Sequence, residues 1–169
     1  MKKNYISILI TNHNKNKYLK KNIKSCLNQD YDNFEVIVYD DRSTDNSVKT
    51  LKKFKKIKLI QNNTNYYFPP LNQIEGLMQA FKKSRGNIIC LLDADDYFYS
   101  DKLKLINSFF NLNKKKNIAF DIPFSKYKNF QPKTKKNYYS IWPSIVPTSG
   151  ISLRRKTLKN FFMLSEIKK

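Results

Sequence analysis

Residues 88–96 have the sequence Ile-Ile-Cys-Leu-Leu-Asp-Ala-Asp-Asp, a short apolar run that leads directly into three acids. Three similar apolar runs precede it, at residues 6–11, 34–40 and 57–61. Strands that are apolar on both faces belong to sheets covered on both sides, and such sheets are mostly parallel. We therefore expect the four runs to be strands of one largely parallel sheet.

The segments next to these runs carry helical periodicity. Apolar residues recur there at the spacing of one buried helical stripe. The stripes are Leu19, Ile23, Cys26 and Leu27; Leu71, Ile74, Met78 and Phe81; and Leu103, Ile106, Phe109 and Phe110. Ser100 and Asp101 are placed to cap the third helix. Alternating strands and helices predict an α/β fold with right-handed crossovers.

Beyond residue 100 the pattern is less regular. An apolar stretch at residues 118–124 and a segment rich in Pro and Tyr at residues 138–147 precede Thr148-Ser149-Gly150. We predict mixed strands and loops in this part. Because no linker separates it from the first part, we expect residues 1–112 to form an α/β core and residues 113–169 to extend the same domain.

The composition excludes several classes of protein. A chain of 169 residues with 40% hydrophobic residues fits one domain with its own core. Two cysteines and one histidine cannot make a disulfide framework or a zinc site, and we expect Cys26 and Cys90 to be buried. Three glycines exclude a glycine-rich phosphate loop. Because no apolar run approaches the roughly 20 residues of a membrane span and no signal peptide opens the chain, we expect a cytoplasmic protein.

The net charge of +20 permits two interpretations. Residues 101–169 hold 16 Lys and Arg against 3 Asp and Glu, which suits an anionic membrane surface, a charged substrate or nucleic acid. However, 29 of the 33 basic residues are Lys, and Asn and Ile are also abundant. A general drift in composition would give such a surface without any anionic partner.

Polar side chains collect at one edge of the predicted sheet. The first run ends in Thr11-Asn12-His13-Asn14, the second in Asp40-Asp41-Arg42-Ser43 and the fourth in Asp93-Ala94-Asp95-Asp96. Ligands of open α/β sheets bind beyond the carboxyl ends of the strands, and acids that face one another there need a cation. Asp is also a common turn former. For residues 40–41, a turn is as good an explanation as a ligand site. For residues 93–95, a turn is the weaker explanation.

The Asp-x-Asp step places two carboxylates on the same side of the chain. Mg²⁺ and Mn²⁺ accept one or two carboxylates and complete their coordination with water and phosphate oxygens. Such an ion neutralises a diphosphate leaving group. An Asp at the end of the second run could accept a hydrogen bond from N3–H of uracil or thymine. His13 could offer its ring face to the same base, or it is a solvated or structural loop residue. The sequence thus predicts a site for a uridine or thymidine diphosphate held through a metal.

Two blocks of the sequence resemble family 2 glycosyltransferases. The first contains Ile6-Ser7-Ile8-Leu9-Ile10-Thr11-Asn12-His13-Asn14, Lys17-Tyr18-Leu19, residues 25–38 and Asp40-Asp41-Arg42-Ser43-Thr44-Asp45. The second contains Gly86-Asn87-Ile88-Ile89 and Leu91-Leu92-Asp93-Ala94-Asp95-Asp96. The likeness is close over residues 5–50 and 84–105 and loose elsewhere. It covers the amino-terminal, nucleotide-sugar-binding portion of the family.

The resemblance implies a GT-A fold, a nucleotide-sugar donor, a Mn²⁺ or Mg²⁺ ion and inversion at the anomeric carbon of the sugar. By position it implies that Thr11 and His13 line the base pocket, with His13 where the family usually has Tyr, and that Asp41 binds the base. Asp93 would face the ribose or the metal, and Asp95 would be the principal metal ligand. Residues 142–155 resemble the segment that approaches the acceptor.

The chain departs from the family pattern in two places. Leu77 and Met78 stand where Asn or Arg-Asn often precedes the fourth strand, and Asn72 or Gln73 is available for that contact. An inverting transferase needs a general base, and the family's acid follows the acceptor segment, about where this chain ends. Because the surroundings of Glu166 do not match, we expect a truncation before the catalytic base. Donor binding should then survive better than transfer.

The leading hypothesis is an inverting, metal-dependent glycosyltransferase that moves a sugar from a UDP- or dTDP-sugar to a glycan or lipid-linked acceptor, with peripheral contact at the inner face of the membrane. A haloacid-dehalogenase-type phosphatase is disfavoured, because its Asp-x-Asp follows the first strand. The alternative from another class is a non-catalytic basic module for an anionic membrane surface or for nucleic acid, the latter less favoured. Arg154, Arg155 and the lysines of residues 133–136 would dominate such a module.

Overall fold

The computed structural model describes residues 2–62, 69–121 and 148–166, and of these only the backbone of residues 69–71 and 164–166. The strands of these residues form one sheet in the order β3-β2-β1-β4-β6-β5. The four parallel strands are β1 (Ile6–Asn12), β2 (Phe34–Asp40), β3 (Ile57–Gln61) and β4 (Ile88–Asp93). β6 (Ile151–Arg154) is antiparallel to both β4 and β5 (Ile118–Phe120). The expected, largely parallel α/β sheet is confirmed.

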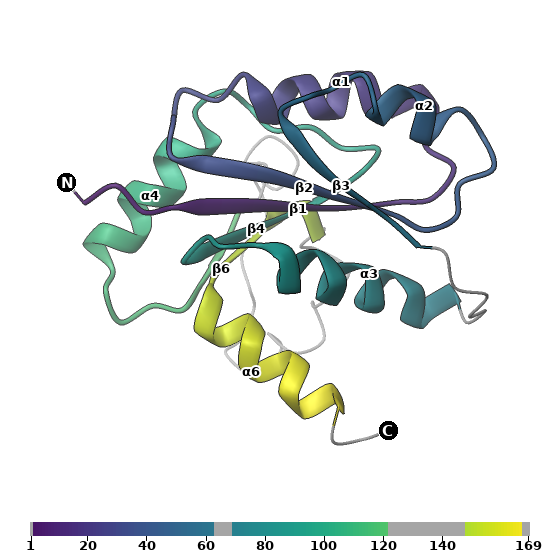
Figure 1. The fold of residues 1–169 in the computed structure, drawn as a ribbon. Coiled ribbons are helices and arrows are strands. Elements are labelled where there is room, and N and C mark those ends of the chain that lie inside the picture. Colours follow the sequence, from purple (N-terminus) through teal and green to yellow (C-terminus); the bar gives the residue numbers. More distant parts are fainter. Residues whose placement is uncertain (1, 63–68, 122–147, 167–169) are drawn as a thin grey trace, which may run out of the picture.

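Helices cover both faces of the sheet, as Figure 1 shows. The hydrophobic cluster on one face joins the sheet to α1 (Asn16–Leu27), α2 (Ser47–Leu51) and α4 (Lys102–Leu112). The cluster on the other face joins it to α3 (Pro69–Lys83) and α6 (Arg155–Glu166). The 3₁₀ turn η3 (Thr148–Gly150) leads into β6. This three-layer arrangement leaves the carboxyl ends of the parallel strands as an open edge.

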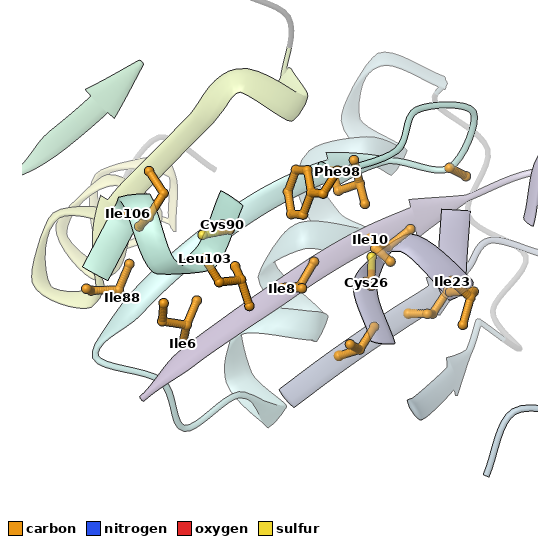
Figure 2. Close-up of a cluster of buried hydrophobic side chains, with 14 of the residues drawn as sticks. Ile6, Ile8, Ile10, Ile23, Cys26, Ile88, Cys90, Phe98, Leu103 and Ile106 are labelled. Carbon is orange, nitrogen blue, oxygen red and sulfur yellow. The ribbon is translucent and has the colours of Figure 1, made fainter. Parts of the chain in front are cut away.

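The strands are apolar on both faces, as the sequence predicts. In β1, Ile8 and Ile10 belong to the cluster under α1 and α4, whereas Leu9 belongs to the cluster under α3. Figure 2 shows the first cluster, in which Cys26 and Cys90 are buried free thiols, as expected. Complete burial of each aliphatic side chain contributes about 1.5–3 kcal/mol. The two clusters therefore fix the sheet between its helices.

Two local expectations are wrong. Asp101 makes no capping hydrogen bond at the start of α4, and Gln29 at the end of α1 takes that role, its Oε1 accepting from the Leu103 N–H at 3.0 Å. Ile74 is 38% exposed, so it is not part of the buried stripe of α3, to which Met78 and Phe81 contribute. Gln29, two residues beyond the end of α1, supplies the cap, and no local pattern at α4 reveals it.

Two arginines join the last described elements to the rest of the fold. Arg154 donates to the backbone carbonyls of Lys116 and Phe110, at 2.9 and 3.0 Å. Arg155 donates to Ser84 Oγ at 2.8 Å and to the carbonyl of Gly86. These bonds commit both guanidinium groups to internal contacts, which differs from the anion-binding role that the basic-module alternative gives them.

Some sequence predictions stay untested. Residues 122–147 lie outside the described residues, so the end of the apolar stretch at 122–124, the segment 138–147 and the lysines of 133–136 have no structural outcome. The boundary between residues 112 and 113 also stays a prediction. In the described part of the chain, none of the helices has the length and apolar character needed to cross a membrane.

Candidate functional site

The carboxyl ends of β1, β2 and β4 meet at a pocket of about 500 Å³. The strand register brings them together, since Asn12 pairs with Asp40 and Thr11 pairs with Asp93. Every residue that the sequence predicts for nucleotide or metal binding lines this pocket: Thr11, His13, Asp41, Asp93 and Asp95. The parallel topology thus gathers residues more than 80 positions apart into one site, while their individual roles stay predictions.

The two acids at the end of β2 have different surroundings. Asp40 is buried, and its carboxylate accepts hydrogen bonds from Asn12 Nδ2 at 2.7 Å and from the Ser43 hydroxyl at 2.7 Å and backbone N–H at 3.1 Å. Asp41 lines the pocket, and its Oδ1 accepts from Arg42 Nε at 3.1 Å and from Asn62 Nδ2 at 2.8 Å. Turn formation therefore explains Asp40, whereas Asp41 is the acid of the pair that lines the pocket.

The loop after β1 is held against the loop after β2. The backbone carbonyl of Asp41 lies 2.6 Å from Nδ1 of His13, and the Asn14 carboxamide accepts from the Thr44 N–H at 2.8 Å. Asn14 and Arg42 have φ values of 52° and 55°, in the left-handed region that side chains rarely adopt. The interlocked loops maintain these conformations and fix one end of the pocket.

At the other end of the pocket, the turn after β4 carries three acids. Burial, followed by the nearby charges of Asp96 and Asp95, raises the pKa of Asp93 above its usual range. Gln73 on α3 donates to Asp93 Oδ1 at 3.1 Å, and Ser149 in η3 donates to Asp96. The hydrogen bond from Lys15 lowers the pKa of Asp95. This end is an anionic site whose charges are only partly compensated.

Asn22 in α1 fixes the backbone of that turn. The side chain is buried, and its Nδ2 donates to the carbonyls of Asp93 and Asp96 at 3.0 and 2.9 Å. Sequence reasoning missed this residue, because it lies mid-helix beside the apolar stripe of Ile23 and Cys26. A polar residue on the buried face of a helix was the available signal.

Helix α3 borders the pocket, and a glycine lets it approach the sheet closely. A Cβ atom on Gly76 would lie 2.7 Å from the Tyr39 ring and 3.1 Å from the Thr11 methyl group. Asn72 and Gln73, one turn before it, line the pocket. Both residues that the sequence offers in place of the missing Asn or Arg-Asn are therefore at the site.

The acceptor-side prediction has a partial structural outcome. Thr148 lines the pocket, and Ser149 Oγ accepts from the Asp93 N–H at 3.0 Å, so η3 touches the acidic end. Residues 142–147 and the side chain of Glu166 are outside the described residues, and no catalytic base is assigned.

The donor set suits a hard divalent cation. Asp93 and Asp95 offer carboxylate oxygens, and Mg²⁺ or Mn²⁺ is commonly held by one or two carboxylates together with substrate phosphates. Among the described residues no three His, Cys, Asp or Glu side chains come together as a complete metal cage. The residues fit a cation that arrives with, or is completed by, a phosphorylated ligand.

Comparison with known proteins gives the family. The model of glycosyl transferase family 2 matches residues 7–165. The chain belongs to glycosyl transferase family 2. An uncharacterized glycosyltransferase of Haemophilus influenzae is 38% identical over 105 residues, which are 59% of this chain and 39% of that protein. The beta-1,3-glucosyltransferase WfaP of Escherichia coli is 32% identical over 99 residues, 58% of this chain and 38% of WfaP.

Solved structures confirm the GT-A fold for this family 2 chain. TarS 1–349 of Staphylococcus aureus, in complex with UDP-GlcNAc, superposes with a TM-score of 0.71 at 23% identity over 92% of this chain and 46% of that one. The mannosyltransferase PcManGT of Pyrobaculum calidifontis, with GDP-Man and Mn²⁺, gives 0.70 at 16% identity over 95% and 47%. The chain thus spans less than half the length of these proteins.

Proposed function

We propose that this family 2 chain binds the donor in an inverting, metal-dependent transfer from a UDP- or dTDP-sugar. The observation that carries the proposal is one pocket of about 500 Å³ with Asp41 at one end and Asp93 and Asp95 at the other. A nucleoside diphosphate needs a hydrogen-bond acceptor for its base and a cation site for its phosphates. The pocket offers both.

Each residue has a distinct role in the proposed complex. Asp41, with Oδ1 held by Arg42 and Asn62, accepts the N3–H of uracil or thymine, and cytosine has no hydrogen there to donate. Thr11 and His13 border the base. Asp93 and Asp95 hold the cation, which when bound neutralises the charge that develops on the leaving diphosphate. Structures of TarS with UDP and with UDP-GlcNAc support a uridine donor.

The proposed acceptor is a glycan or a lipid-linked precursor. Two relatives have names that specify isoprenoid-linked acceptors, a dolichyl phosphate sugar in Methanococcus voltae and a diphosphoundecaprenol sugar for WfaP. A third, TarS, acts on poly(ribitol-phosphate). All three acceptors carry phosphate, which agrees with a protein of net charge +20.

Thermal unfolding of the chain tests donor binding. A ligand that binds only the folded state raises the unfolding midpoint. We expect UDP or dTDP with Mn²⁺ to raise it, GDP and CDP to do so much less, and Asp95→Asn to abolish the shift. Asp32→Asn, an exposed acid paired with Lys3, is the matched control. No shift with any nucleotide in the wild-type chain would refute the proposal.

A second proposal is peripheral contact with the anionic inner face of a membrane, in a cytoplasmic protein. The four exposed lysines of α1 at positions 17, 20, 21 and 24 surround a shallow groove with Tyr97, and Lys21 Nζ lies 3.5 Å from the centre of that ring. Basic residues near an anionic bilayer contribute about 1 kcal/mol each, and Tyr favours the membrane interface.

Vesicle sedimentation tests this contact. We expect binding to phosphatidylglycerol vesicles but not to phosphatidylcholine, and loss of binding when the four α1 lysines become Gln. Replacing Lys83, Lys114, Lys115 and Lys116 by Gln removes the same charge elsewhere and is the control. Equal loss in both variants would indicate a general charge effect and overturn the assignment to α1.

A further inference from the structure

Lys15 makes an ion pair inside the proposed donor site. It lies between β1 and α1, and its Nζ is 2.7 Å from Oδ2 of Asp95. Both residues line the pocket. The side chains are 44% and 40% exposed, so the contact is open to ligands and to rearrangement. The carboxylate predicted to be the principal metal ligand thus has a cationic partner within the protein.

The charges around this pair explain why the ammonium group of Lys15 lies beside Asp95. The turn at residues 93–96 brings three carboxylates close enough for Asp96 and Asp95 to raise the pKa of Asp93. Among the described residues that line the pocket, the other guanidinium or ammonium group belongs to Arg42, which is bonded to Asp41 at the opposite end. Lys15 is therefore the counter-ion of the acidic end.

We propose that Lys15 is an exchangeable counter-ion, which occupies Asp95 in the metal-free site and moves onto the donor diphosphate when a divalent cation takes its place. The inference rests on the proposed donor-binding function and adds a positioning residue to it. A divalent cation and an ammonium group on the same carboxylate oxygen repel strongly, so they exclude one another. The diphosphate that arrives with the cation gives the displaced ammonium a new anionic partner in the same pocket.

This exchange differs in its consequences from an ordinary surface ion pair. An exposed pair contributes little to stability. A pair outside the binding site would also leave ligand affinity unchanged when it is removed. An exchangeable counter-ion instead opposes binding of the metal alone and favours binding of the metal with the diphosphate. Removing the ammonium should therefore change the two affinities in opposite directions.

The test compares Lys15→Met with the wild-type chain and with Lys20→Met, which removes an exposed lysine from α1 outside this pocket. Free Mn²⁺ is followed by its electron paramagnetic resonance signal while the nucleotide-free chain is titrated. We expect Lys15→Met to bind Mn²⁺ about fivefold more tightly than the wild-type chain. This is the largest change in affinity that one exposed ion pair typically causes. With saturating Mn²⁺, calorimetry should show UDP binding about fivefold weaker in the same variant.

The two measurements separate the possible failures. Unchanged or weaker Mn²⁺ binding by Lys15→Met overturns the counter-ion role, and unchanged UDP binding overturns the transfer onto the diphosphate. A wild-type chain that binds no UDP with Mn²⁺ refutes the proposed donor function, and the Mn²⁺ titration then still decides whether Lys15 competes for Asp95. Equal changes in Lys15→Met and Lys20→Met would reveal a non-specific charge effect and overturn the inference.

Discussion

Asn22→Ala should loosen the turn that carries the acidic end of the site. The substitution removes two partly buried hydrogen bonds, of 3.0 Å to the Asp93 carbonyl and 2.9 Å to the Asp96 carbonyl. At about 1 kcal/mol each, plus the cost of carbonyls left without a donor, the loss is about 2–4 kcal/mol. The Asp93 carbonyl keeps the Asp96 N–H at 3.1 Å, which lowers the cost. Ala also favours the helix by about 0.5 kcal/mol.

The net expectation is a loss of about 2 kcal/mol in the free energy of unfolding. Urea unfolding measures it, as a lower midpoint at an unchanged denaturant slope. Asn22→Asp is the sharper variant, because it also loses both donors and adds a negative charge beside Asp93. It should be less stable than Asn22→Ala at pH 7.5 and should bind UDP with Mn²⁺ more weakly.

Lys20→Ala, an exposed position on the same helix, is the control and should change the stability by less than about 0.5 kcal/mol. A loss below about 0.5 kcal/mol in Asn22→Ala would refute the reasoning, since the two bonds would then contribute nothing net. So would an Asn22→Asp variant that binds UDP with Mn²⁺ as tightly as the wild-type chain.

Three further substitutions test the charges and the close contacts. Because the pKa of Asp93 is raised in the folded state, ionising this carboxyl lowers the free energy of unfolding. The loss is absent below pH about 4 and grows as the pH rises through the folded-state pKa. Asp93→Asn should therefore raise the urea midpoint at pH 7.5 but not at pH 3.5, while weakening UDP binding with Mn²⁺; a lower midpoint at pH 7.5 would contradict this. Gly86→Ala should lower the free energy of unfolding in urea by about 2–3 kcal/mol, because its Cβ would lie 2.5 Å from the Ser7 backbone nitrogen. An unchanged midpoint would contradict this predicted clash. Arg155→Met should cost about 2 kcal/mol by losing the bonds to Ser84 and Gly86, against no change in the exposed Lys156→Met.

The parallel strands could be predicted from the sequence because most buried positions of these strands carry apolar residues. Ile8, Leu9 and Ile10 are all buried, so the run is apolar without alternation, and its length and flanking turns identify a strand. The sequence does not identify β5 and β6 in the same way. β6 has a pattern of half-buried, buried, buried and half-buried residues and ends in an arginine, which predicts neither its direction nor its neighbours.

The site was predictable only where one strand end determines it. Asp41, Asp93 and Asp95 follow apolar strands, so the topology alone brings them to one edge. The partners of these acids could not be predicted, because each comes from another element. Lys15 precedes α1 and Gln73 lies in α3, and both reach the acids only after the helices have packed. Side-chain direction, which spacing does not give, decides such contacts.

The two ends of the pocket differ in how firmly the protein holds them, and this difference bears on binding. At the end proposed to bind the nucleotide base, Asp40 is buried and hydrogen-bonded to Asn12 and Ser43. The loops at this end are therefore already in place when a ligand binds. At the acidic end, the Lys15 and Asp95 side chains are 44% and 40% exposed, and in the proposed exchange a cation replaces Lys15 at Asp95. A rigid base end costs little ordering entropy on binding, whereas the acidic end responds to charge. In the proposed donor complex, selectivity for the base then resides in the fixed loops, and the dependence on metal resides in the proposed exchange of Lys15.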